Sequence, residues 1–298
     1  MRKELVILSG FLGSGKTTLL RQLLTQCRTR KVAVLLNDFG EIPVDGELLR
    51  RDGLAGGMVV EIGGGSVFCA CLRESFVKAL RDLRRRDEDL VIVEASGMSD
   101  PATVDKMLRL SGLDDDFEHT ATICLFDPVK SLKLAHVLEV IPRQLASATV
   151  AVLTKSDLAT EQELVAARAY ISAREPDLPV VTASRGRLDP ATLPARAARA
   201  FSFGFNTPET RPDTFSLTDV NCSADDLIAA LEKEEHVLRV KGFVRACDGI
   251  WFISDTGRGI EKRPDTAAPV PLTIICFQGS AESVRNTLQA GHIITLPA

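Results

Sequence analysis

The sequence predicts an α/β fold, with a mostly parallel β-sheet flanked by helices, followed by a smaller α+β domain. Over the first two hundred residues, short and nearly continuous apolar runs alternate with amphipathic stretches, which is typical of βα units. Near Phe201 the composition changes, and glycine and proline interrupt any regular element. We therefore expect two domains, comprising residues 1–205 and 206–298.

The strands and helices of the first domain are predicted from apolar runs and from apolar residues at helical spacing. Strands buried on both faces are expected at six apolar runs: Leu5–Leu8, Val32–Leu36, Leu90–Val93, Thr122–Phe126, Val150–Leu153 and Val180–Thr182. Between them, apolar residues at helical spacing predict three amphipathic helices: Thr17–Cys27, Glu74–Arg86 and Glu161–Ala173.

The second domain mixes strands and helices in a different order. We expect five strands, at Thr214–Leu217, Val237–Arg245, Ile250–Ser254, Leu272–Phe277 and Ile293–Leu296. Two helices are expected, one capped by Ser223 and ending near Glu234, and one over Ala281–Ala290.

Composition excludes several classes of protein. The net charge of −4 and the isoelectric point near 5.7 provide no excess positive charge for a nucleic-acid backbone. The apolar runs are too short to cross a membrane, and the chain opens with a strand instead of a signal peptide, so we expect a cytoplasmic protein. Seven cysteines favour free thiols or metal ligands over a disulfide framework.

The run GFLGSGKTT, Gly10 to Thr18, joins the first strand to the first helix and fits the phosphate-binding pattern G-x-x-x-x-G-K-[ST]. Such a loop turns backbone N–H groups toward phosphate oxygens, while the lysine reaches the β and γ phosphates and the threonine binds Mg²⁺. The sequence thus predicts a P-loop NTPase. The expected nucleotide contacts here are Gly10, Gly13, Ser14, Gly15, Lys16, Thr17 and Thr18, with Thr17 also a ligand of Mg²⁺.

Glu94 follows the Leu90–Val93 strand at the edge of the sheet where ligands bind. Its carboxylate can contact Mg²⁺ through water or orient the attacking water. We expect Lys16 and Glu94 to be catalytic.

A base-reading site is expected after the two last strands of the first domain. Thr154, Lys155 and Asp157 form TKSD, and Ser184 follows the next strand. An aspartate accepts hydrogen bonds from N1–H and N2–H₂ of guanine, whereas adenine has no such donor pair. Asp157 would therefore select GTP, and Lys155 would pack its stem along the base.

Two further segments carry candidate metal ligands. Asp38 and Glu41 lie in NDFGE, where a loop can sense the γ-phosphate, and Cys69 and Cys71 form a C-x-C pair. Two thiolates can hold Zn²⁺ or Co²⁺, and the other ligands would come from Glu41, Asp38, a third cysteine or a second subunit. Buried or redox-active thiols are the alternative.

Several segments together resemble the CobW-type GTPases, a family of P-loop metallochaperones that includes HypB-like and UreG-like proteins. They are GFLGSGKTTLL, NDFGEIPVDGELL, EASGMSDP and, in the second domain, VLRVKGFV and TIICFQGS, which resemble the C-terminal CobW module. The resemblance implies Mg²⁺-dependent GTP hydrolysis coupled to delivery of a metal ion or a corrinoid. The partner would be a client metalloenzyme or corrinoid protein, and a homodimer is compatible with the ligand count.

The chain departs from the family pattern at two positions. The usual C-x-C-C motif reads GGSVFCAC here, with Ser66 and Phe68 where cysteines are expected, and Thr154 replaces the asparagine of NKxD. A three-thiol site cannot form in the usual way. Two alternative functions stay open: a nucleotide-gated adaptor of a corrinoid enzyme without metal transfer, and a small-molecule kinase.

Overall fold

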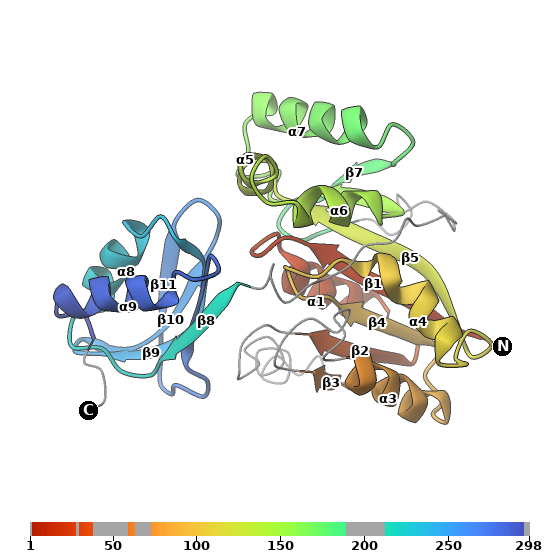
Figure 1. Cartoon of the computed structure of the whole chain (residues 1–298), viewed down its shortest axis with the longest axis horizontal. Coiled ribbons are helices and arrows are strands. Elements are labelled where there is room, and N and C mark those ends of the chain that lie inside the picture. The colour runs from red at the N-terminus through yellow and green to blue at the C-terminus, as the bar shows by residue number, and fades with distance from the viewer. Residues whose placement is uncertain (1, 28–29, 38–58, 63–72, 189–211, 295–298) are drawn as a thin grey trace. The chain divides into compact units, whose positions relative to one another are not determined.

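The computed structural model describes residues 2–27, 30–37, 59–62, 73–188 and 212–294 (Figure 1). These residues belong to two compact units, the first up to residue 188 and the second from residue 212. The predicted domain boundary at residues 205 and 206 lies outside the described residues.

The first unit is built on a seven-stranded sheet with the order β3-β2-β4-β1-β5-β6-β7, and every neighbouring pair is parallel. The strands are β1 (Lys3–Gly10), β2 (Val32–Asn37), β3 (Val59–Ile62), β4 (Leu90–Glu94), β5 (Phe117–Phe126), β6 (Val150–Leu153) and β7 (Val180–Thr182). The predicted parallel α/β sheet is confirmed. Because the chain adds β2 to β4 on one side of β1 and β5 to β7 on the other, a ligand crevice is expected at the carboxyl end of β1.

Helices cover both faces of this sheet. They are α1 (Lys16–Gln26), α3 (Arg73–Arg84), the 3₁₀ turn η1 (Pro101–Thr103), α4 (Val104–Leu110), α5 (Lys130–Leu134), α6 (Val140–Ala146) and α7 (Glu161–Arg174). None of the helices in the described part of the chain combines the length and apolarity needed to span a bilayer.

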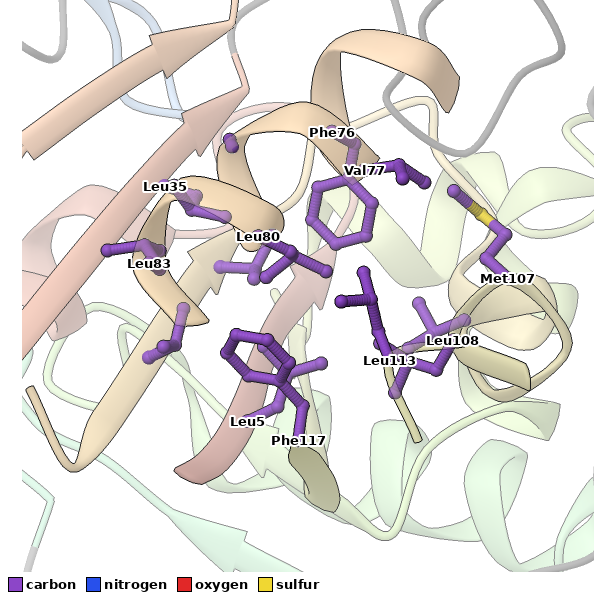
Figure 2. Packing of buried hydrophobic residues seen from close by; sticks show 14 of the residues in the cluster. Leu5, Leu35, Phe76, Val77, Leu80, Leu83, Met107, Leu108, Leu113 and Phe117 are labelled. Atoms are coloured by element: carbon purple, nitrogen blue, oxygen red, sulfur yellow. The ribbon is translucent and has the colours of Figure 1, made fainter. Parts of the chain in front are cut away.

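Alternate residues of the strands enter two separate cores. Leu5 and Ile7 of β1 belong to the core beneath α3 and α4, where Phe76 and Leu80 point from α3 into the cluster (Figure 2). Leu8 of β1 belongs to the core on the opposite face, which α1 covers. Burial on both faces explains why these strands are apolar throughout.

The second unit contains a five-stranded sheet of order β11-β10-β9-β12-β8 in which all neighbouring strands are antiparallel. Its elements are β8 (Asp213–Leu217), α8 (Ala224–Glu232), β9 (Val237–Ala246), β10 (Gly249–Asp255), β11 (Ile260–Asp265), β12 (Leu272–Cys276) and α9 (Ala281–Ala290). Both helices share one core with the sheet. The predicted α+β domain is confirmed.

The closing strand predicted at Ile293–Leu296 is wrong for Ile293 and Ile294, and the rest of that range lies outside the described residues. The chain turns back on the end of α9, with His292 at φ 59°, and the N–H of Ile293 donates to the carbonyl of Leu288 at 2.9 Å. The apolar pair is buried in the core that the sheet and the two helices share, instead of forming a strand.

Candidate functional site

The loop between β1 and α1 leaves the start of a helix open. Gly10, Gly13 and Gly15 all have positive φ, at 130°, 77° and 96°. Among the described residues no side chain caps α1, and its first turn contains no acidic residue, whereas α7 begins with a capping box of Thr160 and Glu163. The N–H groups and the positive end of the dipole at α1 are therefore available to an anion.

Lys16 reaches back across this loop. Its Nζ donates to the carbonyls of Gly10 at 2.7 Å and Phe11 at 3.3 Å, and the side chain is buried. Burial raises the pKa of the Cys124 thiol in β5 to about 12, while the Lys16 charge acts in the opposite direction. A buried ammonium group thus lies at the carboxyl end of β1.

Thr17 and Glu94 meet at the first turn of α1. The hydroxyl of Thr17 donates to Oε1 of Glu94 at 2.9 Å, and Glu94, which ends β4, is almost fully buried. A hydroxyl and a carboxylate are hard oxygen donors, which is the ligand chemistry that Mg²⁺ prefers. The donor set fits Mg²⁺ beside a phosphate loop.

The segment after β4 packs directly on the phosphate loop. A Cβ at Gly97 would lie 2.5 Å from Cδ2 and 2.7 Å from the backbone nitrogen of Leu12. The buried Gln144 of α6 donates from Nε2 to the carbonyls of Gly97 at 3.1 Å and Ser99 at 2.9 Å. Gln144 is a positioning residue that the sequence did not indicate, because its partners are backbone carbonyls and leave no pattern of side chains.

The segment after β6 is tied to the phosphate loop by one hydroxyl. Thr154 Oγ1 donates to the carbonyl of Ser14 at 2.8 Å, and Thr154 is buried. The next residue, Lys155, has φ 53° and donates from Nζ to Oδ2 of Asp127 at 2.8 Å. Asp127 was not predicted, although a polar residue directly after the apolar run of β5 was the available signal.

Asp157 is held against the segment after β7. Its Oδ1 accepts from the backbone N–H of Arg185 at 3.0 Å, and this bond lowers the pKa of Asp157, with the Ser184 side chain contributing in the same direction. Arg185 has φ 51°. The structure thereby brings the TKSD segment and Ser184 together and favours the carboxylate form that guanine recognition requires.

The same segment contacts the start of α1. A Cβ at Gly186 would lie 2.5 Å from Cγ2 of Thr18. Three separate segments, which follow β1, β6 and β7, therefore meet in one region. The predicted metal residues Asp38, Glu41, Cys69 and Cys71 lie outside the described residues. Within the residues that are described, no group of three or more His, Cys, Asp or Glu side chains is arranged to hold a metal ion.

The sequence of this chain is similar to one described protein domain and to several known proteins. The nucleotide-binding domain described as CobW/HypB/UreG matches residues 4–182. The zinc chaperone CobW of Pseudomonas aeruginosa is 32% identical over 213 residues, covering 61% of this chain and 56% of that protein, so the match spans little more than half of that relative. The zinc chaperone YeiR of Escherichia coli is 29% identical over 316 residues and covers 95% of both chains.

A solved structure shows a similar fold. The crystal structure of the Zn(II)-bound YjiA GTPase from Escherichia coli has a TM-score of 0.50 and 21% sequence identity, covering 99% of this chain and 100% of that one.

Proposed function

Because this chain belongs to the CobW/HypB/UreG family, we propose that it is a metallochaperone that uses GTP hydrolysis to deliver Zn²⁺ to a client metalloprotein. The chain is a GTPase. The observation that carries the GTPase part of the proposal is the Thr17–Glu94 pair at the start of α1, where no described side chain caps the helix. The names of the relatives support zinc as the cargo.

Binding of GTP begins at the open helix end. The phosphates would accept from N–H groups of residues 13–18, and the ammonium of Lys16 would exchange its carbonyl partners for phosphate oxygens. Mg²⁺, held by Thr17 with Glu94 beside it, would neutralise charge on the β and γ phosphates. Glu94 is followed three residues later by Gly97, whose carbonyl Gln144 contacts. Loss of the γ-phosphate would therefore shift Glu94 and with it the segment that follows β4.

Replacing Asp157 with alanine is expected to lower the preference for GTP over ATP by about 100-fold, because the pair of donors on guanine loses its acceptor. The ratio of kcat/KM for the two nucleotides measures this. Asp177→Ala, which removes another exposed aspartate of the first unit, is the matched control and should leave the ratio unchanged. An ATP preference in the unmodified protein would instead favour a small-molecule kinase.

Replacing Thr154 with valine is expected to lower the free energy of unfolding by about 1–2 kcal/mol, because the buried Ser14 carbonyl loses a donor at 2.8 Å. The same change should raise the KM for GTP, since the base-reading segment loses its tie to the phosphate loop. Thr154→Ser retains the hydroxyl and should behave as the unmodified protein in urea denaturation and in kinetics. Equal behaviour of the valine and serine variants would contradict this role.

Variants of the two cysteines in the C-x-C pair test whether the protein carries a metal. Substituting Cys69 and Cys71 with serine should abolish any GTP-dependent Zn²⁺ affinity, measured by competition with a chromogenic chelator. The double variant Cys222→Ser/Cys247→Ser, which removes two thiols of the second unit, is the control and should retain that affinity. If the C-x-C variant binds zinc as the unmodified protein does, the cargo role fails while the GTPase activity stands.

A further inference from the structure

The turn between β9 and β10 contacts the start of α8 at two points. The turn consists of Cys247 and Asp248, between Ala246 of β9 and Gly249 of β10. The backbone N–H of Cys247 donates to the carbonyl of Cys222 at 3.0 Å. Oδ1 of Asp248 accepts from the N–H of Ala224, the first residue of α8, at 3.0 Å. These two bonds hold the turn against the segment from Cys222 to Ala224.

The separation of the two backbones is within the range that a disulfide between these cysteines requires. Standard bond lengths and angles, combined with the 3.0 Å hydrogen bond, place the Cα atoms of Cys222 and Cys247 no more than about 7 Å apart. Beyond roughly that separation a disulfide requires backbone movement. No such movement is needed here to bring the backbones into range.

The two thiols differ in access. Cys247 is exposed and Cys222 is half-buried, and both are free thiols. Burial raises the pKa of Cys222, and the charges of Asp226 and Cys247 raise it further, so the two thiols are close enough to influence each other. Cys247 is therefore the thiol that meets a reagent in solution first, and Cys222 is placed to react second.

We propose that Cys222 and Cys247 form a dithiol that is oxidised to an intramolecular disulfide by low-molecular-weight disulfides. The Cys247 thiolate attacks one sulfur of the small disulfide, which breaks that S–S bond, forms a mixed disulfide and releases one thiolate. The Cys222 thiolate then attacks the sulfur of Cys247 and displaces the second small thiolate. Two protein thiols become one disulfide, the small disulfide is reduced to two thiols, and the protons pass to the released thiolates.

The disulfide would fasten the tip of the β9–β10 hairpin to the residue that precedes the cap of α8. The crosslink encloses all of α8 and β9, so it restricts the unfolded chain over a long loop. Trp251, the single tryptophan of the chain, donates from Nε1 to Oδ1 of Asp248 at 3.2 Å and so lies beside the pair. Its fluorescence therefore reports on the second unit, close to this pair.

The experiment exposes the reduced, metal-free full chain to oxidised glutathione and maps the peptides by mass spectrometry. We expect a Cys222–Cys247 disulfide, a change in Trp251 fluorescence, and a rise of about 10 °C in the midpoint of the thermal transition seen by that fluorescence. A reductant should reverse all three. A persistent glutathione adduct on Cys247, a link to Cys69 or Cys71, or the absence of reaction would overturn the proposal.

Variants separate the two chemical steps. Cys222→Ser should stop the reaction at the glutathione adduct on Cys247, and Cys247→Ser should prevent the fluorescence change. Cys27→Ser removes another half-buried thiol, located in the first unit, and should leave the disulfide and its midpoint shift intact. Loss of the disulfide in Cys27→Ser would also contradict the assignment. Because the peptide map is made on the unmodified chain, the result does not depend on the folding of any variant.

Discussion

Replacing Lys16 with alanine is expected to lower kcat for GTP hydrolysis by about 10²- to 10³-fold, which is the typical effect of removing one group that stabilises charge in a transition state. Lys16 is the buried cation at the open end of α1, and its Nζ lies 2.7 Å from the carbonyl of Gly10. Without it, the phosphates would lose a positive charge that offsets the negative charge developing in the transition state. Phosphate release under saturating GTP is the measurement.

Lys3 supplies the matched control for this variant. Its Nζ also donates to two carbonyls, those of Arg86 at 2.7 Å and Glu88 at 2.6 Å, but it stands at the opposite end of β1. Lys3→Ala therefore removes a comparable pair of contacts and should leave kcat unchanged. If both variants lost the same activity, the effect of Lys16 would be one of stability and the catalytic assignment would fail.

Replacing Gly10 with alanine is expected to lower the free energy of unfolding by about 3 kcal/mol or more, because backbone strain and a steric clash add together. Gly10 has φ 130°, and a Cβ there would lie 2.3 Å from the carbonyl oxygen of Leu125 and 2.8 Å from Oγ of Ser14. The clash is with the backbone of a central strand, which cannot move aside. Urea denaturation followed by circular dichroism measures the loss.

The same substitution at Gly15 distinguishes backbone strain from the steric clash. Gly15 also has positive φ, at 96°, but nothing lies within 4 Å of the position that its Cβ would take. Gly15→Ala should therefore cost only the strain, about 1 kcal/mol. Equal losses for the two variants would show that the contact between the loop and β5 has no energetic importance.

Six of the seven strands of the parallel sheet could be predicted because each is an apolar run that alternates with amphipathic stretches, whereas β3 (Val59–Ile62) was not predicted. The P-loop could be predicted because Gly10, Lys16 and Thr17 stand at a fixed spacing between a strand and a helix. In both cases the prediction depends only on residues that lie within a few positions of one another in the sequence. Local causes of this kind are visible in a single sequence.

Other features could not be predicted, because their residues lack an apolar pattern, include proline, or have partners far away in the sequence. Strand β11 was missed because its residues are partly or largely exposed and include Pro264, which is compatible with the edge of a sheet. Helix α6 contains Pro142 in its first turn, where a missing N–H costs little, so the proline concealed a helix. Gln144 was missed because its partners, the carbonyls of Gly97 and Ser99, lie in a segment far from it in the sequence.

The order of the strands has a consequence for the size of the ligand. The phosphate loop follows β1, and the TKSD segment, which we propose reads the base, follows β6, with only β5 between them in the sheet. At about 4.8 Å per strand, the two binding regions are separated by roughly 10 Å along the sheet edge. Because backbone hydrogen bonds set this spacing, the proposed contacts to the phosphates and to the base are held at a fixed separation. Substitution of side chains in the TKSD segment can therefore alter which base is accepted without changing this separation.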